Sequence, residues 1–227
     1  MFTPLGVNVH IGVSSELQGQ LDIVDTVTLS DEEIARDATE AGRHDVLEQL
    51  KQYQESMKDV VKKDNPTAWA GMDNSFWNSE SARRAEVTSR GGLASARGLA
   101  VIADSLAQTG NGIISRDTWL KMHQEAKEGV MLGGLRTFFT QGGVNCFVDG
   151  EDYSKGDINE SVPKLWAQRI PRGMFGWNGY GGSVFVWDLE RQLSFAYVPT
   201  YLAWYDKERR RAVKCLKALY GCLDARQ

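Results

Sequence analysis

The sequence predicts an α+β fold, with helical segments first, then an antiparallel sheet, and finally a helix that packs against it. Three patterns support this class. Apolar residues recur at helical spacing between Leu93 and Gln108, two apolar runs near the C-terminus are separated by a turn, and a second helical pattern starts at Asp206. Because helices and strands are grouped and do not alternate, a parallel sheet of βαβ units is not expected.

The composition is that of a globular chain. Hydrophobic residues make up 42% of the 227 positions and charged residues 25%, which is enough apolar material for a core. The net charge of −4 gives no general electrostatic attraction to nucleic acid or to an anionic membrane. We therefore expect neither a nucleic acid nor a membrane as partner.

The first part of the chain contains one strand pattern followed by charged helical patterns. Apolar residues alternate over residues 7–13, which is the period of a strand. Ser30 and Glu33 have the spacing of a capping box, so one or two exposed helices are expected over residues 31–63. Pro66 ends this region.

Residues 64–92 are rich in glycine, asparagine and serine, and we expect a loop here. The loop contains three large aromatic residues, Trp69, Phe76 and Trp77. Such side chains either pin a polar loop onto a core or line a pocket, and the sequence leaves both interpretations open.

The later elements are clearer. The expected order is a helix over 93–108, a short helix from 115, a strand over 144–148, a hairpin of strands 183–187 and 193–198, and a helix from 206. We expect residues 1–227 to form a single domain, with 1–140 mainly helical and 141–227 holding the hairpin and its packing helix.

The three cysteines are expected to be reduced and semi-buried. Cys215 and Cys222 lie seven residues apart on a predicted helix, about 10 Å along its axis, which is too far for a disulfide. Reduced thiols and the lack of a visible signal pattern favour the cytoplasm.

No metal or cofactor is expected, because the histidines at 10, 44 and 123 are far apart and none has a second ligand at zinc spacing.

Three segments, taken in order, carry a resemblance to a known family. The first is Pro-Leu-Gly at 4–6, followed by the strand pattern. The second runs over 89–100 as Ser-Arg-Gly-Gly-Leu-Ala-Ser-Ala-Arg-Gly-Leu-Ala, and the third over 175–183 as Phe-Gly-Trp-Asn-Gly-Tyr-Gly-Gly-Ser. Together they resemble the serine β-lactamase-like family of class C β-lactamases, penicillin-binding proteins and esterases, and most closely its eukaryotic β-lactamase domain-containing members.

The resemblance implies an antiparallel sheet flanked by helices beside a helical domain. It also implies a nucleophilic serine in a Ser-x-x-Lys turn, with the lysine or a tyrosine as base. Because the matching segments begin midway through the family's fold, we expect an N-terminally truncated domain that lacks the N-terminal strands and the nucleophile helix.

The motifs of the catalytic machinery are missing from the sequence. No tyrosine has an asparagine two residues later, and Ser-x-x-Lys occurs once, at Ser161 to Lys164, in the wrong order for the family. We interpret Ser161 as a loop or helix start and expect no catalytic residue in this chain. A new nucleophile at Ser161 or Ser183 is the remaining enzymatic option.

The third segment departs from the family's Lys/His-Thr-Gly strand. The indole at position 177 cannot offer the cation that pairs with a substrate carboxylate, which favours a neutral ester or amide. The glycines either let a ligand approach the backbone or merely permit twist or a bulge. The expected substrate-binding residues are Trp177, Asn178, Gly179, Tyr180 and Gly181.

Two functions follow from these expectations. The first is a β-lactamase-related serine hydrolase domain, catalytically incomplete in this chain, that binds a small ester or amide. The second is a non-catalytic binding or interaction module that uses the same groove. In either case, strands without their neighbours expose unpaired edges, so self-association is expected.

Overall fold

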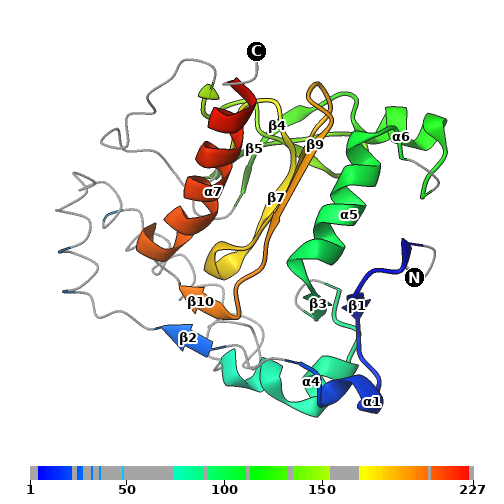
Figure 1. The fold of residues 1–227 in the computed structure, drawn as a ribbon, viewed down its shortest axis with the longest axis vertical. Helices are drawn as coiled ribbons and strands as arrows, with labels where there is room; N and C mark the ends of the chain where they lie inside the picture. Colours follow the sequence, from blue (N-terminus) through cyan, green and yellow to red (C-terminus); the bar gives the residue numbers. More distant parts are fainter. Residues whose placement is uncertain are drawn as a thin grey trace.

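The computed structural model describes residues 5–21, 25–27, 32, 36, 48, 74–88, 91–110, 113–131, 135–153, 169–203 and 206–224. Its centre is a six-stranded sheet in the order β4-β5-β6-β7-β8-β9, and every neighbouring pair in it is antiparallel. Helices α5 and α7 flank this sheet (Figure 1). The predicted α+β class is therefore confirmed.

The strands of the central sheet follow one another in chain order, so the sheet is a meander. Their bounds are β4 Lys127–Met131, β5 Leu135–Phe139, β6 Asn145–Cys146, β7 Phe175–Asn178, β8 Val184–Asp188 and β9 Leu193–Tyr197. The predicted hairpin is the β8–β9 pair, in which Val186 lies opposite Phe195.

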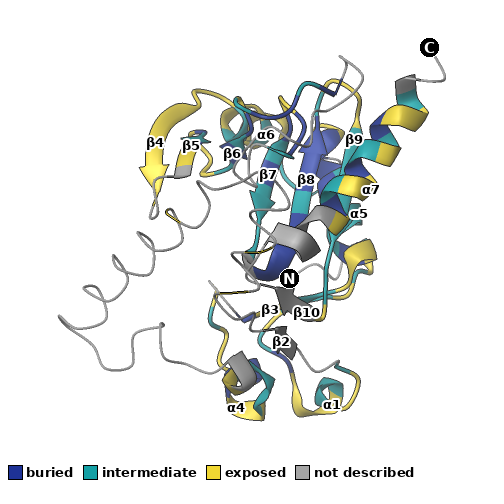
Figure 2. Ribbon diagram, turned by 90° about the vertical axis from the view of Figure 1, so that its left-hand side faces the viewer, coloured by how far each residue is buried: buried dark blue, intermediate teal, exposed yellow. Residues whose placement is uncertain are grey.

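Two apolar clusters lie on the two faces of the sheet, because alternate residues of β8 point in opposite directions. Val184 and Val186 pack with Leu216 of α7 (Asp206–Asp224), and all three are at most 1% exposed. Trp187 packs with Ile102 of α5 (Ala96–Ala107) on the other face. Figure 2 shows β8 as the most buried strand, as its nearly continuous apolar run predicts.

Helix α5 starts later than its sequence pattern predicts. Ser95 is its N-cap and accepts a hydrogen bond of 3.0 Å from the Gly98 N–H. The preceding residues Gly92–Ala94 form strand β3, which pairs antiparallel with β1 (Val9–Ile11). The expected helix over 93–108 is therefore wrong in its first three positions, because pairing with β1 takes up that backbone.

The segment predicted as loop over 64–92 contains regular structure where it is described. Asn74–Asn78 form a 3-10 helix, η2, and Glu80–Arg84 form helix α4 with Ser79 as its N-cap. Phe76 is 42% exposed, and its ring meets Trp77 edge-on at 5.5 Å. Trp69 and the helices expected over 31–63 lie outside the described residues, apart from 32, 36 and 48.

Shorter elements complete the described part. Helix α1 spans Ser15–Gln18, and α6 spans Arg116–Met122 with Ser115 as its N-cap. A second two-stranded sheet pairs β2 (Asp25–Val27) in parallel with β10 (Tyr201–Ala203).

Strands β4 and β5 were not predicted from the sequence. They form an antiparallel hairpin within the segment 1–140, which was expected to be mainly helical. Every residue of β4 is exposed, and Figure 2 shows this strand at the margin of the sheet. Its sequence, Lys-Glu-Gly-Val-Met, lacks the apolar alternation that identifies a half-buried strand.

The cysteines are free thiols, as expected, but two of them are more exposed than expected. Cys146 is half-buried, whereas Cys215 and Cys222 are exposed on α7. In the parts of the chain that the structure describes, no helix combines the length and the apolar character needed to cross a membrane.

Candidate functional site

The expected substrate-binding segment lies where β7 ends and turns back into β8. Trp177 and Asn178 are the last two residues of β7, and Gly179 follows them. The Gly179 N–H donates to the Ser183 carbonyl at 2.8 Å, and the Gly182 N–H donates to the Gly179 carbonyl at 3.2 Å. These two bonds close a tight turn between the paired strands.

Glycine is required in this turn for conformational and steric reasons. Gly181 has φ +81° and Gly182 has φ +98°, a region that side chains with a Cβ rarely adopt. A Cβ on Gly179 would overlap the Ser183 Oγ. The turn also lies against α7 and β10.

The structure separates the five expected residues by burial. Trp177, Asn178 and Gly179 are half-buried, whereas Gly181 is buried. The side chain of Tyr180 is outside the described part of the chain. Trp177, Asn178 and Gly179 are therefore the members of the set that offer surface to a ligand, and their role as substrate-binding residues stays a prediction.

Trp177 has an aromatic neighbour that the sequence did not reveal. Its ring stacks on that of Phe139 of β5, with centroids 5.4 Å apart and an interplanar angle of 30°. Offset stacking of this kind stabilises a pair by about 0.5–1.5 kcal/mol beyond the area it buries. Because Phe139 comes from an unpredicted strand 38 positions earlier in the chain, no sequence signal linked it to this site.

A small hollow lies beside this aromatic pair. It is lined by Trp177, by Asn145 and Cys146 of β6, and by residues of β5 and the 147–150 segment. Its volume is about 20 Å³, which is room for about one water molecule. A larger ligand would therefore rest on the hollow and on the indole without being enclosed.

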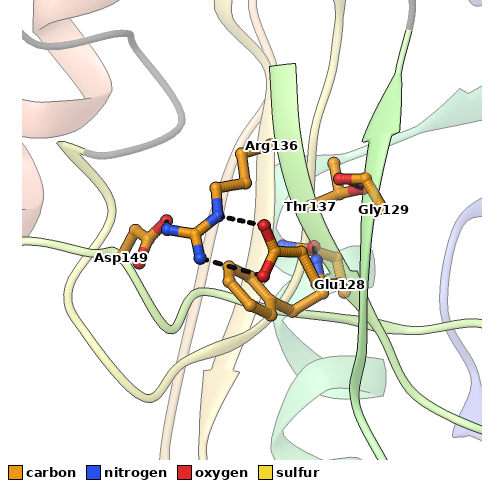
Figure 3. Close-up of polar contacts among 7 residues, drawn as sticks. Glu128, Gly129, Arg136, Thr137 and Asp149 are labelled. Carbon is orange, nitrogen blue, oxygen red and sulfur yellow. Dashed lines mark hydrogen bonds and ion pairs between the residues drawn. The ribbon is translucent and has the colours of Figure 1, made fainter. Parts of the chain in front are cut away.

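Arg136 borders the hollow and is held by two carboxylates (Figure 3). Its Nε and Nη2 donate to the two oxygens of Glu128 at 2.6 and 2.9 Å, and its Nη1 donates to Asp149 at 2.9 Å. These bonds lower the pKa of Glu128. The guanidinium charge is thus already balanced, which leaves this side of the hollow without an uncompensated cation from Arg136.

Cys146 lines the hollow together with Trp177, and its thiol is a candidate nucleophile there. Burial raises the pKa of its thiol. A thiol is nucleophilic only as the thiolate, so this cysteine is a poor nucleophile at neutral pH.

Neither serine option gains support from a neighbouring base. Ser161 lies outside the described residues. Within the described part, the Ser183 Oγ makes no hydrogen bond to a histidine, lysine or carboxylate, and the side chain is half-buried in the glycine turn.

His123 is likewise not available as a catalytic base at this site. Its Nε2 accepts a hydrogen bond from the Trp187 indole at 2.9 Å, and its Nδ1 lies 2.8 Å from the Trp119 carbonyl. Both ring nitrogens are thus occupied inside an aromatic cluster. Among the described residues, no group of three or more histidine, cysteine, aspartate or glutamate side chains is placed to hold a metal ion.

Comparisons with known proteins were made on sequence and on structure. No family model and no curated protein matches the chain. A novel penicillin-binding protein homologue from Caulobacter crescentus has a similar structure, with a TM-score of 0.59 and 18% identity over 97% of this chain and 50% of its own. EstA from Arthrobacter nitroguajacolicus Rue61a gives a TM-score of 0.55 and 14% identity over 96% of this chain and 51% of its own.

This chain spans about half the length of these two proteins. At such low identity the likeness establishes the fold alone, so a closest relationship to eukaryotic members and an N-terminal truncation stay predictions. The mixed architecture of an antiparallel sheet flanked by helices is a fold that this chain shares with about half of the penicillin-binding protein homologue and about half of EstA.

Proposed function

We propose that this chain is a β-lactamase-related serine hydrolase domain that binds a small uncharged ester or amide at the Trp177 end of β7. The observation that carries the proposal is the stacked pair of Trp177 and Phe139, with Trp177 at the end of β7 that leads into the glycine turn. In the family that the sequence resembles, a lysine or histidine stands at the position of this tryptophan. An indole there favours a ligand without a carboxylate, since a neutral aromatic ring offers no charge-assisted hydrogen bond.

We also propose that the 227-residue chain by itself is catalytically incomplete. Ester or amide hydrolysis by this family's route needs a serine nucleophile activated by an adjacent base. The described residues place no base beside Ser183, and His123 is bonded to Trp119 and Trp187. Nucleophile and base act as a unit, so a chain without the pair would lose most of the rate.

The first experiment measures chemistry. The whole 227-residue chain is treated with a fluorophosphonate probe and assayed separately with phenyl acetate. We expect no covalent label on folded protein and no hydrolysis above the buffer rate. A label on Ser161 or Ser183 that prevents ester turnover would contradict the proposed incompleteness.

The second experiment separates the hydrolase domain from the alternative of a non-catalytic binding module. It determines the sequence at the 5′ end of the native transcript. An in-frame Ser-x-x-Lys and Tyr-x-Asn upstream of residue 1 would support the hydrolase. An in-frame stop codon directly upstream would favour the binding module.

The binding site itself is tested by saturation-transfer NMR with phenyl acetate as the probe. We expect magnetisation transfer to be lost in Trp177→Ala and largely kept in Trp177→Phe, because the phenyl ring preserves an aromatic surface. Val130→Ala is the control, since Val130 is 72% exposed on β4 and does not line the hollow. Equal transfer in all three variants would place the ligand elsewhere.

A further inference from the structure

We propose that two copies of this chain associate through strand β9, by antiparallel pairing of its free edge with the same edge of the second copy. The expected result is one continuous sheet across a two-fold axis. The interaction follows from the backbone of β9, the chemistry of its side chains and their burial.

The free edge of β9 is the first observation. Its residues Leu193–Tyr197 pair with β8 on one side, and no described strand pairs with the other side. All five residues are half-buried, whereas four of the five residues of β8 are buried. An edge strand presents a row of unpaired N–H and C=O groups, and these groups are satisfied by another strand.

The strand at the opposite edge of the sheet, β4, is less suited than β9 to pairing with a second copy. Strand β4 carries Lys127, Glu128 and Gly129, and such charged residues and glycines are features that protect an edge from further pairing. Strand β9 reads Leu-Ser-Phe-Ala-Tyr and has neither a charge nor a proline. Of the two edges in the described sheet, β9 is therefore the unprotected one.

The side chains of β9 are complementary to those of the same strand in a second copy. In an antiparallel pair centred on Phe195, Leu193 lies opposite Tyr197 of the second copy, and Ser194 lies opposite Ala196. Large residues thus meet large residues on the face of the α7 core, and small residues meet small residues on the face of α5. A two-fold interface has this property, because each residue pair occurs twice.

Partial burial of the large side chains gives the association its driving force. Leu193, Phe195 and Tyr197 pack against the margin of the cluster formed by β8 and α7, but all three remain partly exposed. Their counterparts in a second copy would cover them. Because no charge lies within the strand, bringing the two strands together creates no like-charge repulsion in it.

The first test uses the unaltered chain. Sedimentation velocity gives its mass, and hydrogen exchange with mass spectrometry follows the amides of β9 and β4 from about 1 µM to about 1 mM protein. We expect a dimer at high concentration, and about tenfold slower exchange of the outward-facing β9 amides than at low concentration. Exchange in β4 should not depend on concentration.

The second test fixes the register. Ser194→Cys and Ala196→Cys are made separately in a chain that also carries Cys215→Ser and Cys222→Ser, because the native thiols at those positions are exposed. Opposed residues in an antiparallel pair have Cα atoms about 4.5–5.5 Å apart, which a disulfide can bridge. We expect a disulfide when the two variants are mixed and much less with either alone. Val130→Cys, on the other edge, is the control.

Three results would overturn the proposal. The first is a strictly monomeric chain at millimolar concentration. The second is a dimer in which exchange of the β9 amides does not change on dilution, since its interface would lie elsewhere. The third is a monomer whose β9 amides are protected at every dilution, which would mean that another segment of the same chain covers the edge.

Discussion

The indole N–H of Trp187 donates a hydrogen bond of 2.9 Å to Nε2 of His123. An indole nitrogen can only donate, so Nε2 must be unprotonated. The proton of the neutral ring is then on Nδ1, where it is donated to the Trp119 carbonyl at 2.8 Å. This neutral histidine connects helix α6 to strand β8, and its ring also meets Phe175 edge-on at 4.8 Å.

The first prediction concerns acid stability. Burial lowers the pKa of His123 below its ordinary 6.5, and the Trp119 carbonyl opposes this in part. The unfolded chain therefore binds a proton more readily than the folded one, so the free energy of unfolding should fall as the pH drops below about 6.5. Urea titrations between pH 8 and pH 5 measure this dependence.

In His123→Gln this part of the pH dependence should disappear. An NMR titration of the His123 ring in the unaltered protein checks the cause directly, because its midpoint should lie below 6.5. A midpoint at or above that value would contradict the explanation.

The second prediction concerns Asp188, which is 3% exposed. Its Oδ1 accepts from the backbone N–H groups of Glu190 and Arg191, and its Oδ2 accepts from Arg191 and from the Tyr220 hydroxyl at 2.9 Å. Burial, and then the Asp188 charge, raises the pKa of Tyr220 far above its usual range. The hydroxyl therefore stays a donor at every ordinary pH.

Asp188→Asn should lower the free energy of unfolding by about 3 kcal/mol, because buried charge-assisted bonds are lost. Guanidinium denaturation followed by circular dichroism measures the change. Glu190→Gln is the matched control, since Glu190 is 88% exposed and lies 3.9 Å from Arg191. Its effect should stay within about 0.5 kcal/mol. Equal losses in both variants would rule out the role assigned to Asp188.

The third prediction separates steric overlap from backbone strain. Gly176 of β7 has φ +123°, and a Cβ there would overlap the Phe185 carbonyl of β8. Gly173 has φ +84°, but a Cβ on it would meet no atom within 4 Å. Gly173→Ala should therefore cost about 1 kcal/mol from strain alone.

Gly176→Ala should cost at least about 2 kcal/mol more than Gly173→Ala, since strands β7 and β8 must also move apart. Thermal unfolding of both variants measures the difference. If the two substitutions cost the same, the contact between β7 and the Phe185 carbonyl is not as close as described.

The fourth prediction rests on the proposed ligand. Trp177→Lys supplies the cation that the indole lacks and removes the stack on Phe139. Affinity for phenyl acetate should fall about threefold to tenfold, and affinity for monophenyl succinate should rise by about tenfold. Titration calorimetry with both esters measures the shift. Val130→Lys is the control for added charge, and a similar gain in that variant would indicate a non-local effect.

The C-terminal elements could be predicted because their local patterns agree with their packing. Strand β8 is nearly continuously apolar and is buried on both faces, and α7 presents Leu216 and Tyr220 to the sheet at helical spacing. Trp177, Asn178 and Gly179 were proposed as binding residues through the resemblance. The structure places them at the end of β7 and the start of the turn, and their binding role stays a prediction.

Other elements could not be predicted because long-range contacts decide them. Leu93 and Ala94 belong to the helical sequence pattern, yet the segment Gly92–Ala94 pairs with β1 at residues 9–11. Strand β4 is exposed throughout and is held by pairing with β5 and by the bond from Arg136 to Glu128. Phe139 was missed for the same reason, since its contact with Trp177 exists only when β5 and β7 join one sheet.

The chain-order arrangement of the central sheet has a consequence during synthesis. Each strand from β5 to β9 can join a neighbour that has already been made, so the sheet can grow as the ribosome releases it. Helix α7 is released after β9, and until then the Val184 and Val186 side chains have no cover from Leu216. During that interval one apolar face of the sheet is exposed to solvent, and the packing of α7 then covers it.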